Sequence, residues 1–176
     1  MLFEPGSISG AFIVHPERRV DERGFFARMH CEKELADHHL EGSICQINTG
    51  FNPRSGTLRG MHYQSGAHAE VKIMRCVRGA VFDVVVDLRP DSPTFKSWFG
   101  AELTADNGLM LYAPAGTAHG YLTLSDDTEL LYMTNKMYAP DAACGVRFDD
   151  PAFAIEWPAA PGLVSKPDQA WPGFLT

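Results

Sequence analysis

Short apolar runs that alternate with polar residues, separated by glycine and proline, make up most of this chain. The clearest pair surrounds Gly79: the run 73–77 (IMRCV) precedes it, and the run 80–88 (AVFDVVVDL) follows it. The second run has the two-residue period of a strand and is rich in β-branched residues. We therefore predict a hairpin whose second strand is half-buried, with Phe82, Val84, Val86 and Leu88 on one face and Asp83 and Asp87 on the other.

Similar runs recur along the chain and predict a fold made almost entirely of strands. One short helix is predicted from Glu32 to Leu40, with Gly42 as its stop. The 12 prolines and 16 glycines are spread between the runs, a distribution typical of two sheets or a rolled barrel. The further predicted strands are Thr57–Gln64, Trp98–Leu103, Leu109–Tyr112, Gly120–Leu124 and Glu129–Asn135.

Composition narrows the class of protein. The 176 residues fit one domain, 1–176, and the net charge of −7 without a basic stripe argues against a nucleic-acid partner. No apolar run reaches the about 18 residues of a membrane span, and the N-terminus lacks a signal-peptide pattern, so we predict a cytoplasmic protein without a membrane partner. The four cysteines are widely spaced and argue against a zinc knuckle or a disulfide framework.

Four polar residues on or beside apolar strands are candidates for chemistry. His62 follows Gly60 by two residues, which leaves room for a ligand beside the imidazole, and Lys72 lies on an apolar strand face where burial is costly. Tyr132 lies in ELLYMTN, and His119 follows the turn PAGTA. Each has a structural alternative: a core histidine, a lysine that reaches solvent, a core aromatic and a turn cap. Their convergence on one barrel mouth favours a functional site.

A metal site is not predicted. Metal-binding barrels usually carry two histidines one residue apart, a following carboxylate and a later histidine, whereas Tyr63 and Gln64 follow His62 here. The next carboxylate, Glu70, lies beside Lys72, whose charge opposes a cation. We predict no metal and no cofactor.

Several motifs occur in an order that resembles the dTDP-4-dehydrorhamnose 3,5-epimerase family of cupin-fold sugar-nucleotide enzymes. The resemblance runs from about Phe3 to the C-terminus, and the block 78–95 is its most specific part. It implies a metal-free cupin-type jelly roll with short flanking helices, and a homodimer whose strands cross the interface. The motifs are DERGFF (21–26), QIN (46–48), LRGMHYQ (58–64), RGAVFDVVVDLRPDSPTF (78–95), PAGTAHGY (114–121), DDP (149–151) and IEWP (155–158).

The resemblance also implies residue roles in an enolate mechanism on a 4-keto sugar. His62 matches the base, and Asp168 matches the carboxylate that orients and stabilises its imidazole. Lys72 matches the cation beside the ketone oxygen, and Tyr132 matches the acid that reprotonates carbon. Further matches are Arg59, His119, Gln46 and Asn48 as substrate contacts, Tyr138 as the aromatic stacked on the base, and Arg23 as a residue that the partner subunit supplies.

One implied placement conflicts with strand geometry. Strict alternation sends Arg59 and His62 to opposite faces, yet both match substrate-binding positions. A bulge or strong twist at Gly60 would resolve the conflict.

The departures from the family pattern lie on the nucleotide side. Arg28 stands where the family usually has glutamate, Ala143 where it has an acidic residue, and Pro167 where a lysine precedes Asp168. An arginine donor suits the acceptors of cytosine or guanine, so a CDP- or GDP-linked sugar is one hypothesis. In the alternative, Arg28 turns away or contacts phosphate, and thymidine still stacks on Tyr138.

Other functions are compatible with this set of site residues. The sequence leaves open an enzyme that acts at C3 or C5 only, because the pose of the sugar decides that. A ketoisomerase needs groups placed for transfer between neighbouring carbons, which the set of His62, Tyr132 and Asp168 does not favour. A non-catalytic jelly roll that binds sugar nucleotides leaves the buried Lys72 without a role.

Overall fold

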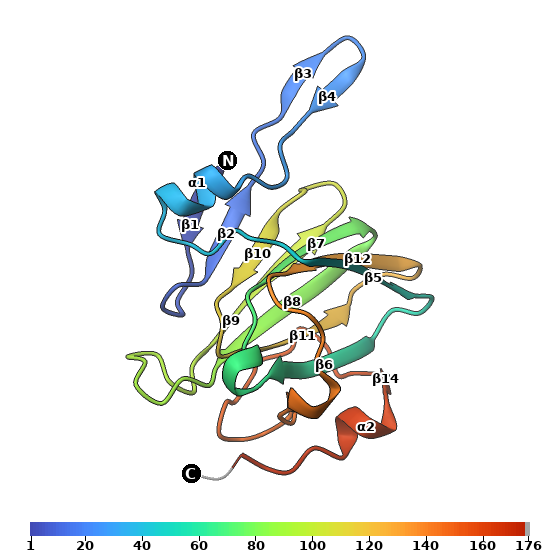
Figure 1. The fold of residues 1–176 in the computed structure, drawn as a ribbon. Coiled ribbons are helices and arrows are strands. Elements are labelled where there is room, and N and C mark those ends of the chain that lie inside the picture. The colour runs from blue at the N-terminus through green and yellow to red at the C-terminus, as the bar shows by residue number, and fades with distance from the viewer. Residues whose placement is uncertain (175–176) are drawn as a thin grey trace.

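The computed structural model describes residues 1–174. Two largely antiparallel sheets pack face to face, and a two-stranded hairpin projects from one end (Figure 1). The first sheet has the order β1 (Leu2–Pro5), β2 (Phe12–His15), β10 (Met110–Ala113), β7 (Lys72–Arg78), β12 (Thr128–Thr134) and β5 (Gln46–Asn52). The second has the order β13 (Ala143–Gly145), β6 (Thr57–Gln64), β11 (Thr117–Thr123), β8 (Ala80–Asp87) and β9 (Trp98–Thr104), with β14 (Leu163–Val164) paired to β6.

Strands that are distant in sequence are neighbours in both sheets, such as β2 with β10 and β6 with β11. This connectivity is that of a jelly roll rather than a meander. The predicted all-β fold is therefore confirmed. The short flanking elements are α1 (Glu32–Asp37), α2 (Lys166–Gln169) and two 3-10 turns at Gly66–His68 and Pro140–Ala142.

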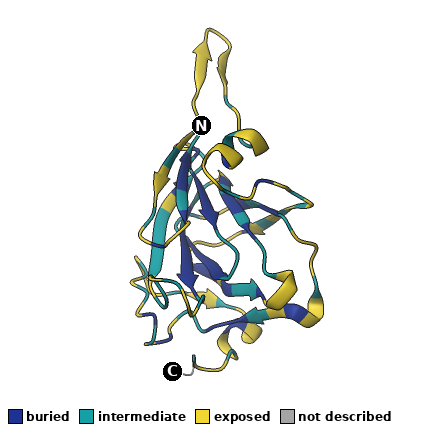
Figure 2. Ribbon diagram, turned by 60° about the vertical axis from the view of Figure 1, so that its left-hand side comes forward, coloured by how far each residue is buried: buried dark blue, intermediate teal, exposed yellow. Residues whose placement is uncertain are grey.

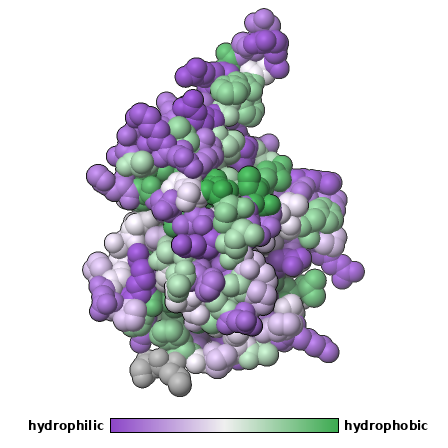
Figure 3. Space-filling model, in the orientation of Figure 1, coloured by the Kyte–Doolittle hydropathy of each residue, from purple (hydrophilic) through white to green (hydrophobic). Residues whose placement is uncertain are grey.

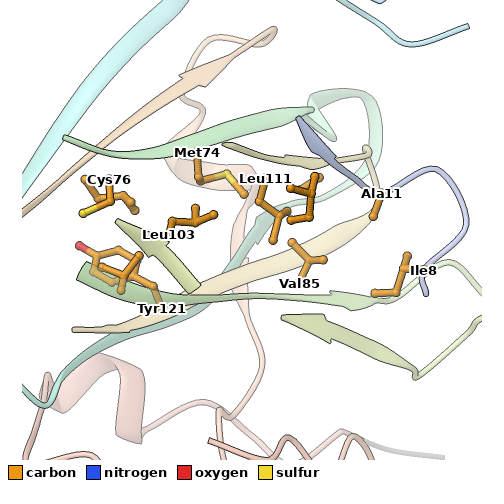
Figure 4. Close-up of a cluster of buried hydrophobic side chains, with 12 residues drawn as sticks. Ile8, Ala11, Met74, Cys76, Val85, Leu103, Leu111 and Tyr121 are labelled. Carbon is orange, nitrogen blue, oxygen red and sulfur yellow. The ribbon is translucent and has the colours of Figure 1, made fainter. Parts of the chain in front are cut away.

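An apolar core fills one part of the space between the sheets (Figure 4). Met74 and Leu111 from the first sheet contact Val85 and Leu103 from the second, and all four are fully buried. Burial of such side chains contributes about 1.5–3 kcal/mol each to the stability of the fold. Figure 2 shows that the strands are buried where the sheets face each other, whereas the hairpin and the helices are exposed.

The predicted hairpin around Gly79 is confirmed, but the predicted half-burial of its second strand is wrong. β8 is buried on both faces because the C-terminal segment packs outside it, with Phe153 against Val84 and Val86. The opposite face points into the barrel and carries Asp83 and Asp87, both completely buried. Strand alternation could not predict this arrangement, since a buried carboxylate requires partners from other segments.

Asp87 shows how such a carboxylate is accommodated. It accepts hydrogen bonds from Arg89, Ser92 and Thr94. Burial alone would raise the pKa of Asp87, but these donors outweigh burial and hold the pKa well below its usual range. The carboxylate is thus charged and fixes the loop between β8 and β9.

A bulge in β6 decides which of its side chains face the interior. His62 pairs with His119 of β11, and Arg59 pairs with Tyr121, so three steps along β6 oppose two steps along β11. The extra residue places Arg59 and His62 on the same face. Strict alternation is therefore wrong here, and the predicted irregularity at Gly60 is confirmed.

The remaining differences from the sequence predictions concern the helix end, short strands and strand ends. The helix ends at Asp37 rather than Leu40, and His39 rather than Gly42 adopts the positive φ (60°) that terminates it. The strands β1 to β5, β13 and β14 were not predicted: six of them are only two to four residues long, and β5 has exposed apolar residues, Ile47 and Phe51, which is the reverse of the usual pattern. The other predicted strands are confirmed with shifted ends, and only Thr57–Gln64 keeps its predicted bounds.

The hairpin formed by β3 (Arg19–Asp21) and β4 (Gly24–Phe26) extends away from the sheets (Figure 1). Its tip is hydrophilic, with apolar side chains below it (Figure 3). Val20, Phe25 and Phe26 are all exposed. None of the helices within residues 1–174 is long and apolar enough to span a bilayer.

Gly60 should be essential to the contact between β6 and β11. Its φ is 138°, and an added Cβ would lie 2.5 Å from the Cα of Gly120. We expect Gly60→Ala to lower the free energy of unfolding in urea by about 2–5 kcal/mol or to prevent folding. Gly162→Ala is the control, because the nearest atom to its Cβ lies 3.9 Å away. Equal stability of the two variants would contradict the prediction.

Candidate active site

A cavity of about 1000 Å³ opens between the two sheets, next to the apolar core. Its walls come from β5, β7 and β12 of the first sheet, from β6 and β11 of the second, and from the segment around α2. All the predicted site residues except Arg23 and Arg28 line it: Gln46, Asn48, Arg59, His62, Lys72, His119, Tyr132, Tyr138 and Asp168.

His62 and Asp168 form a hydrogen-bonded pair although 106 positions separate them. The imidazole Nε2 lies 2.6 Å from Asp168 Oδ1, and the carboxylate is 7% exposed whereas His62 is 45% exposed. Ser165 caps α2 by accepting a hydrogen bond from the backbone N–H of Asp168, which fixes the position of the carboxylate. The pair therefore has a buried anchor and an accessible ring, which suits a general base.

Lys72 lies at the start of β7, on the wall opposite β6. Its ammonium is 3.1 Å from Glu70 Oε1 and donates to the backbone carbonyl of His62 at 3.3 Å. The side chain is 12% exposed. A cation held in this way is placed to stabilise negative charge that develops on a ligand in the cavity.

Tyr132 lies on β12, next to β7 in the first sheet. Burial raises the pKa of Tyr132, the negative charge of Glu70 raises it further, and Arg59 opposes both effects. The phenol therefore keeps its proton at neutral pH. It is available as a hydrogen-bond donor or an acid.

Arg59 and His119 are each held by a buried polar partner. Arg59 Nε donates to Asn52 Oδ1 at 2.8 Å, and the Asn52 amide donates to the hydroxyl of Tyr121. His119 Nε2 lies 2.7 Å from Asp83 Oδ1, and both side chains are at least 90% buried. These contacts orient the guanidinium and the imidazole before any ligand binds.

Tyr138 stands at the open side of the cavity. Its ring is exposed, while its backbone N–H donates to Gln46 Oε1 at 2.6 Å. An exposed ring on a fixed backbone is suited to stack on a planar ligand.

Comparisons with known proteins identify the family of this chain. The family model described as dTDP-4-dehydrorhamnose 3,5-epimerase matches residues 5–175. The chain belongs to this family.

Individual relatives of this epimerase cover almost the whole chain. It is 38% identical over 175 residues to the dTDP-4-dehydrorhamnose 3,5-epimerase of Sinorhizobium fredii, covering 99% of this chain and 90% of the relative. It is 36% identical to a dTDP-4-dehydrorhamnose 3-epimerase of Streptomyces niveus over 96% of this chain and 82% of the relative. The crystal structure of dTDP-4-dehydrorhamnose 3,5-epimerase from Elizabethkingia anophelis superimposes with a TM-score of 0.96, at 35% identity over 99% and 96% of the chains. Epimerases are isomerases, and these structures share the cupin-like jelly roll.

Two predicted site residues of the epimerase lie outside the cavity lining. Arg23 is at the tip of the projecting hairpin, 83% exposed and paired with Asp21. Arg28 donates to Glu34 of α1 at 2.6 Å. In this chain neither guanidinium forms part of the cavity wall.

Sequence analysis missed Asp83 and Gln64, and it considered Glu70 only in the argument about a metal. The sequence did point to Asp83: an aspartate inside an otherwise apolar strand requires a buried polar partner. Glu70 and Gln64 had no such signal, since both lie among polar residues next to His62 and Lys72. Within the described part of the chain, no three His, Cys, Asp or Glu side chains are grouped so that they could hold a metal ion.

The pairing of Asp83 with His119 generates a stability prediction. Asp83→Ala leaves a buried imidazole without its partner, which should lower the free energy of unfolding by about 1–3 kcal/mol. Asp83→Asn retains an acceptor for His119 and should cost less. Urea unfolding of both variants tests this, and equal losses for alanine and asparagine would contradict a hydrogen-bonding role.

Proposed function

We propose that this protein inverts C3 and C5 of dTDP-4-dehydro-6-deoxyglucose through an enolate, without a metal ion. One observation carries the proposal. His62 enters the cavity from β6 of the second sheet, and Tyr132 enters from β12 of the first. Inversion requires a base on one face of the sugar and an acid on the other, and opposite walls supply that arrangement.

The proposed reaction moves one proton at each carbon. The ketone at C4 acidifies the hydrogens on C3 and C5, and His62 removes one of them while Asp168 stabilises the resulting imidazolium. The electron pair moves to O4, where the ammonium of Lys72 stabilises the enolate more than the ketone. Tyr132 then protonates the carbon from the opposite face; afterwards His62 releases its extra proton to solvent, and Tyr132 takes one up.

The proposed nucleotide is dTDP. The family and the relatives named above carry dTDP in their names, and Tyr138 offers an exposed ring for the base. Arg59 and His119 are proposed to contact the phosphates and the sugar, and Gln46 and Asn48 the nucleotide. The hypothesis of a CDP- or GDP-linked sugar depended on Arg28, which pairs with Glu34 and does not line the cavity of its own chain.

A homodimer is part of the proposal. The β3–β4 hairpin carries three exposed apolar side chains and makes few contacts with its own sheets. A second copy of the chain would cover these side chains and receive Arg23 at its cavity. The cytoplasm remains the predicted location.

Solvent exchange tests the proposed chemistry. The protein is incubated in D2O with dTDP-4-dehydro-6-deoxyglucose, and NMR monitors the incorporation of deuterium. We expect deuterium at C3 and C5, and slower exchange with the CDP-linked sugar. His62→Ala should lose exchange by about 10²–10⁴-fold, because it removes the proposed general base. Tyr132→Phe should retain exchange and lose inversion.

The outcomes separate the alternatives. Deuterium at one carbon only would identify an enzyme that acts at a single centre, as the name of the Streptomyces niveus relative indicates for that protein. Tight binding without exchange would contradict catalysis and favour a binding module. Faster exchange with the CDP-linked sugar would contradict the proposed nucleotide.

Arg23→Ala should weaken dTDP binding by about 10- to 100-fold, because a phosphate loses a charge-assisted hydrogen bond from the second copy. Isothermal titration calorimetry measures the affinity, and analytical ultracentrifugation measures the oligomeric state. Arg19→Ala, on the same exposed hairpin, is the matched control. A monomer, or equal affinities for the two variants, would contradict the role of the hairpin.

A further inference from the structure

The carboxylate of Glu70 is largely buried between the ammonium of Lys72 and the side-chain amide of Gln64. Glu70 precedes β7, and its side chain is 10% exposed. Its Oε1 atom is 3.1 Å from the ammonium of Lys72, and its Oε2 atom accepts a hydrogen bond from Gln64 Nε2 at 2.9 Å. One carboxylate thus holds the end of a lysine and the end of a glutamine.

Gln64 connects this carboxylate to the segment that carries Tyr138. Its Oε1 atom accepts a hydrogen bond from the backbone N–H of Ala139 at 2.7 Å. Its second Nε2 hydrogen is shared between the carbonyls of Met137 and His68, each 3.3 Å away. Gln64 therefore contacts the backbone of both residues next to Tyr138, Met137 and Ala139. Gln64 itself is 4% exposed, so water does not compete for these bonds.

We propose that Glu70 is a positioning residue for the epimerisation: with Gln64 it fixes Lys72 at the sugar end and the Tyr138 segment at the base end of one cavity. This inference rests on the proposed function. It assigns to Glu70 and Gln64 a role in setting the distance between the enolate-stabilising cation and the base-stacking ring.

The geometry of Lys72 supports a positioning role. An ammonium has three donors, and two of them are engaged by Glu70 and by the carbonyl of His62. The third donor is then restricted in direction and remains for the ketone oxygen. A buried ion pair is a weak source of stability, because desolvation offsets most of its attraction. Its function here is to orient the lysine.

Glu70 also acts on Tyr132. Burial raises the pKa of this phenol and the charge of Glu70 raises it further. The charged or titratable groups around the ring are Arg59 on β6, Tyr121 on β11, and Glu70 and Lys72 at the start of β7. Removing the charge of Glu70 therefore lowers the pKa of Tyr132, and activity that needs the phenol is lost at a lower pH.

Glu70→Gln is the test, because it keeps the size of the side chain and removes its charge. We expect kcat on dTDP-4-dehydro-6-deoxyglucose to fall by about 10- to 100-fold, with a smaller change in KM, and the basic limb of the pH profile to move to lower pH. Glu102→Gln is the control, since Glu102 is exposed on β9 and makes no side-chain contact with the cavity lining. An unchanged kcat and an unchanged basic limb would overturn the proposal.

A second measurement does not depend on turnover. The chain has five lysines, and ¹⁵N labelling of their ammonium groups gives signals that persist where the group is held rigidly. We expect a persistent signal in the wild-type protein that disappears in Lys72→Arg and in Glu70→Gln but not in Glu102→Gln. Retention in Glu70→Gln would overturn the proposal. If the wild-type protein shows no turnover, the proposed function fails while this measurement still decides the role of Glu70.

The link to Tyr138 is tested by a double-mutant cycle. If Glu70 and Tyr138 are coupled through Gln64, Glu70→Gln and Tyr138→Ala together should reduce kcat/KM by less than the product of their separate effects. Glu102→Gln with Tyr138→Ala should give the simple product. Multiplicative effects in both pairs would overturn the coupling.

Discussion

The contact between the backbones of β6 and β11 at Gly60 and Gly120 is the constraint on which the site depends. Because no side chain separates the strands there, β6 accommodates an extra residue, and Arg59 and His62 face the same space. A regular ladder would turn one of them out of the cavity. The position of the imidazole relative to the guanidinium is thus a property of the backbone, and the polar walls are arranged around it.

The buried carboxylates inside this barrel each have a charged or polar partner, either on another strand or two residues along the chain. Asp83 bonds to His119, Asp87 to Arg89, Asp168 to His62 and Glu70 to Lys72. An apolar core next to the cavity holds the sheets together, so the ion pairs need not contribute much stability. They instead restrict the orientation of groups that face the cavity, which is the condition for preorganised electrostatics.

Much of the fold could be predicted from local pattern, but most of the site could not. Alternation and Gly79 were sufficient for the central hairpin, because both signals lie within a few residues. The burial of Asp83, the extra residue at Gly60 and the contacts of Gln64 with Met137 and Ala139 depend on partners far along the chain. The pairing of His62 with Asp168 was expected only from resemblance, because no spacing rule connects positions 106 apart. The helix end at His39 depends on a non-glycine residue in a left-handed conformation, which sequence patterns rarely reveal.

The distance in sequence between His62 and its carboxylate has a consequence for the newborn chain. At 5–20 residues per second, a ribosome needs roughly 5–20 s to add the 106 positions between them. During that interval the strands β7 to β12 are synthesised, and Asp168 is not yet present to pair with the imidazole. Each chain therefore passes through a period in which most of its strands have been synthesised and the His62–Asp168 pair cannot yet form. The His62–Asp168 pair, on which the proposed chemistry rests, can form only once translation has passed α2.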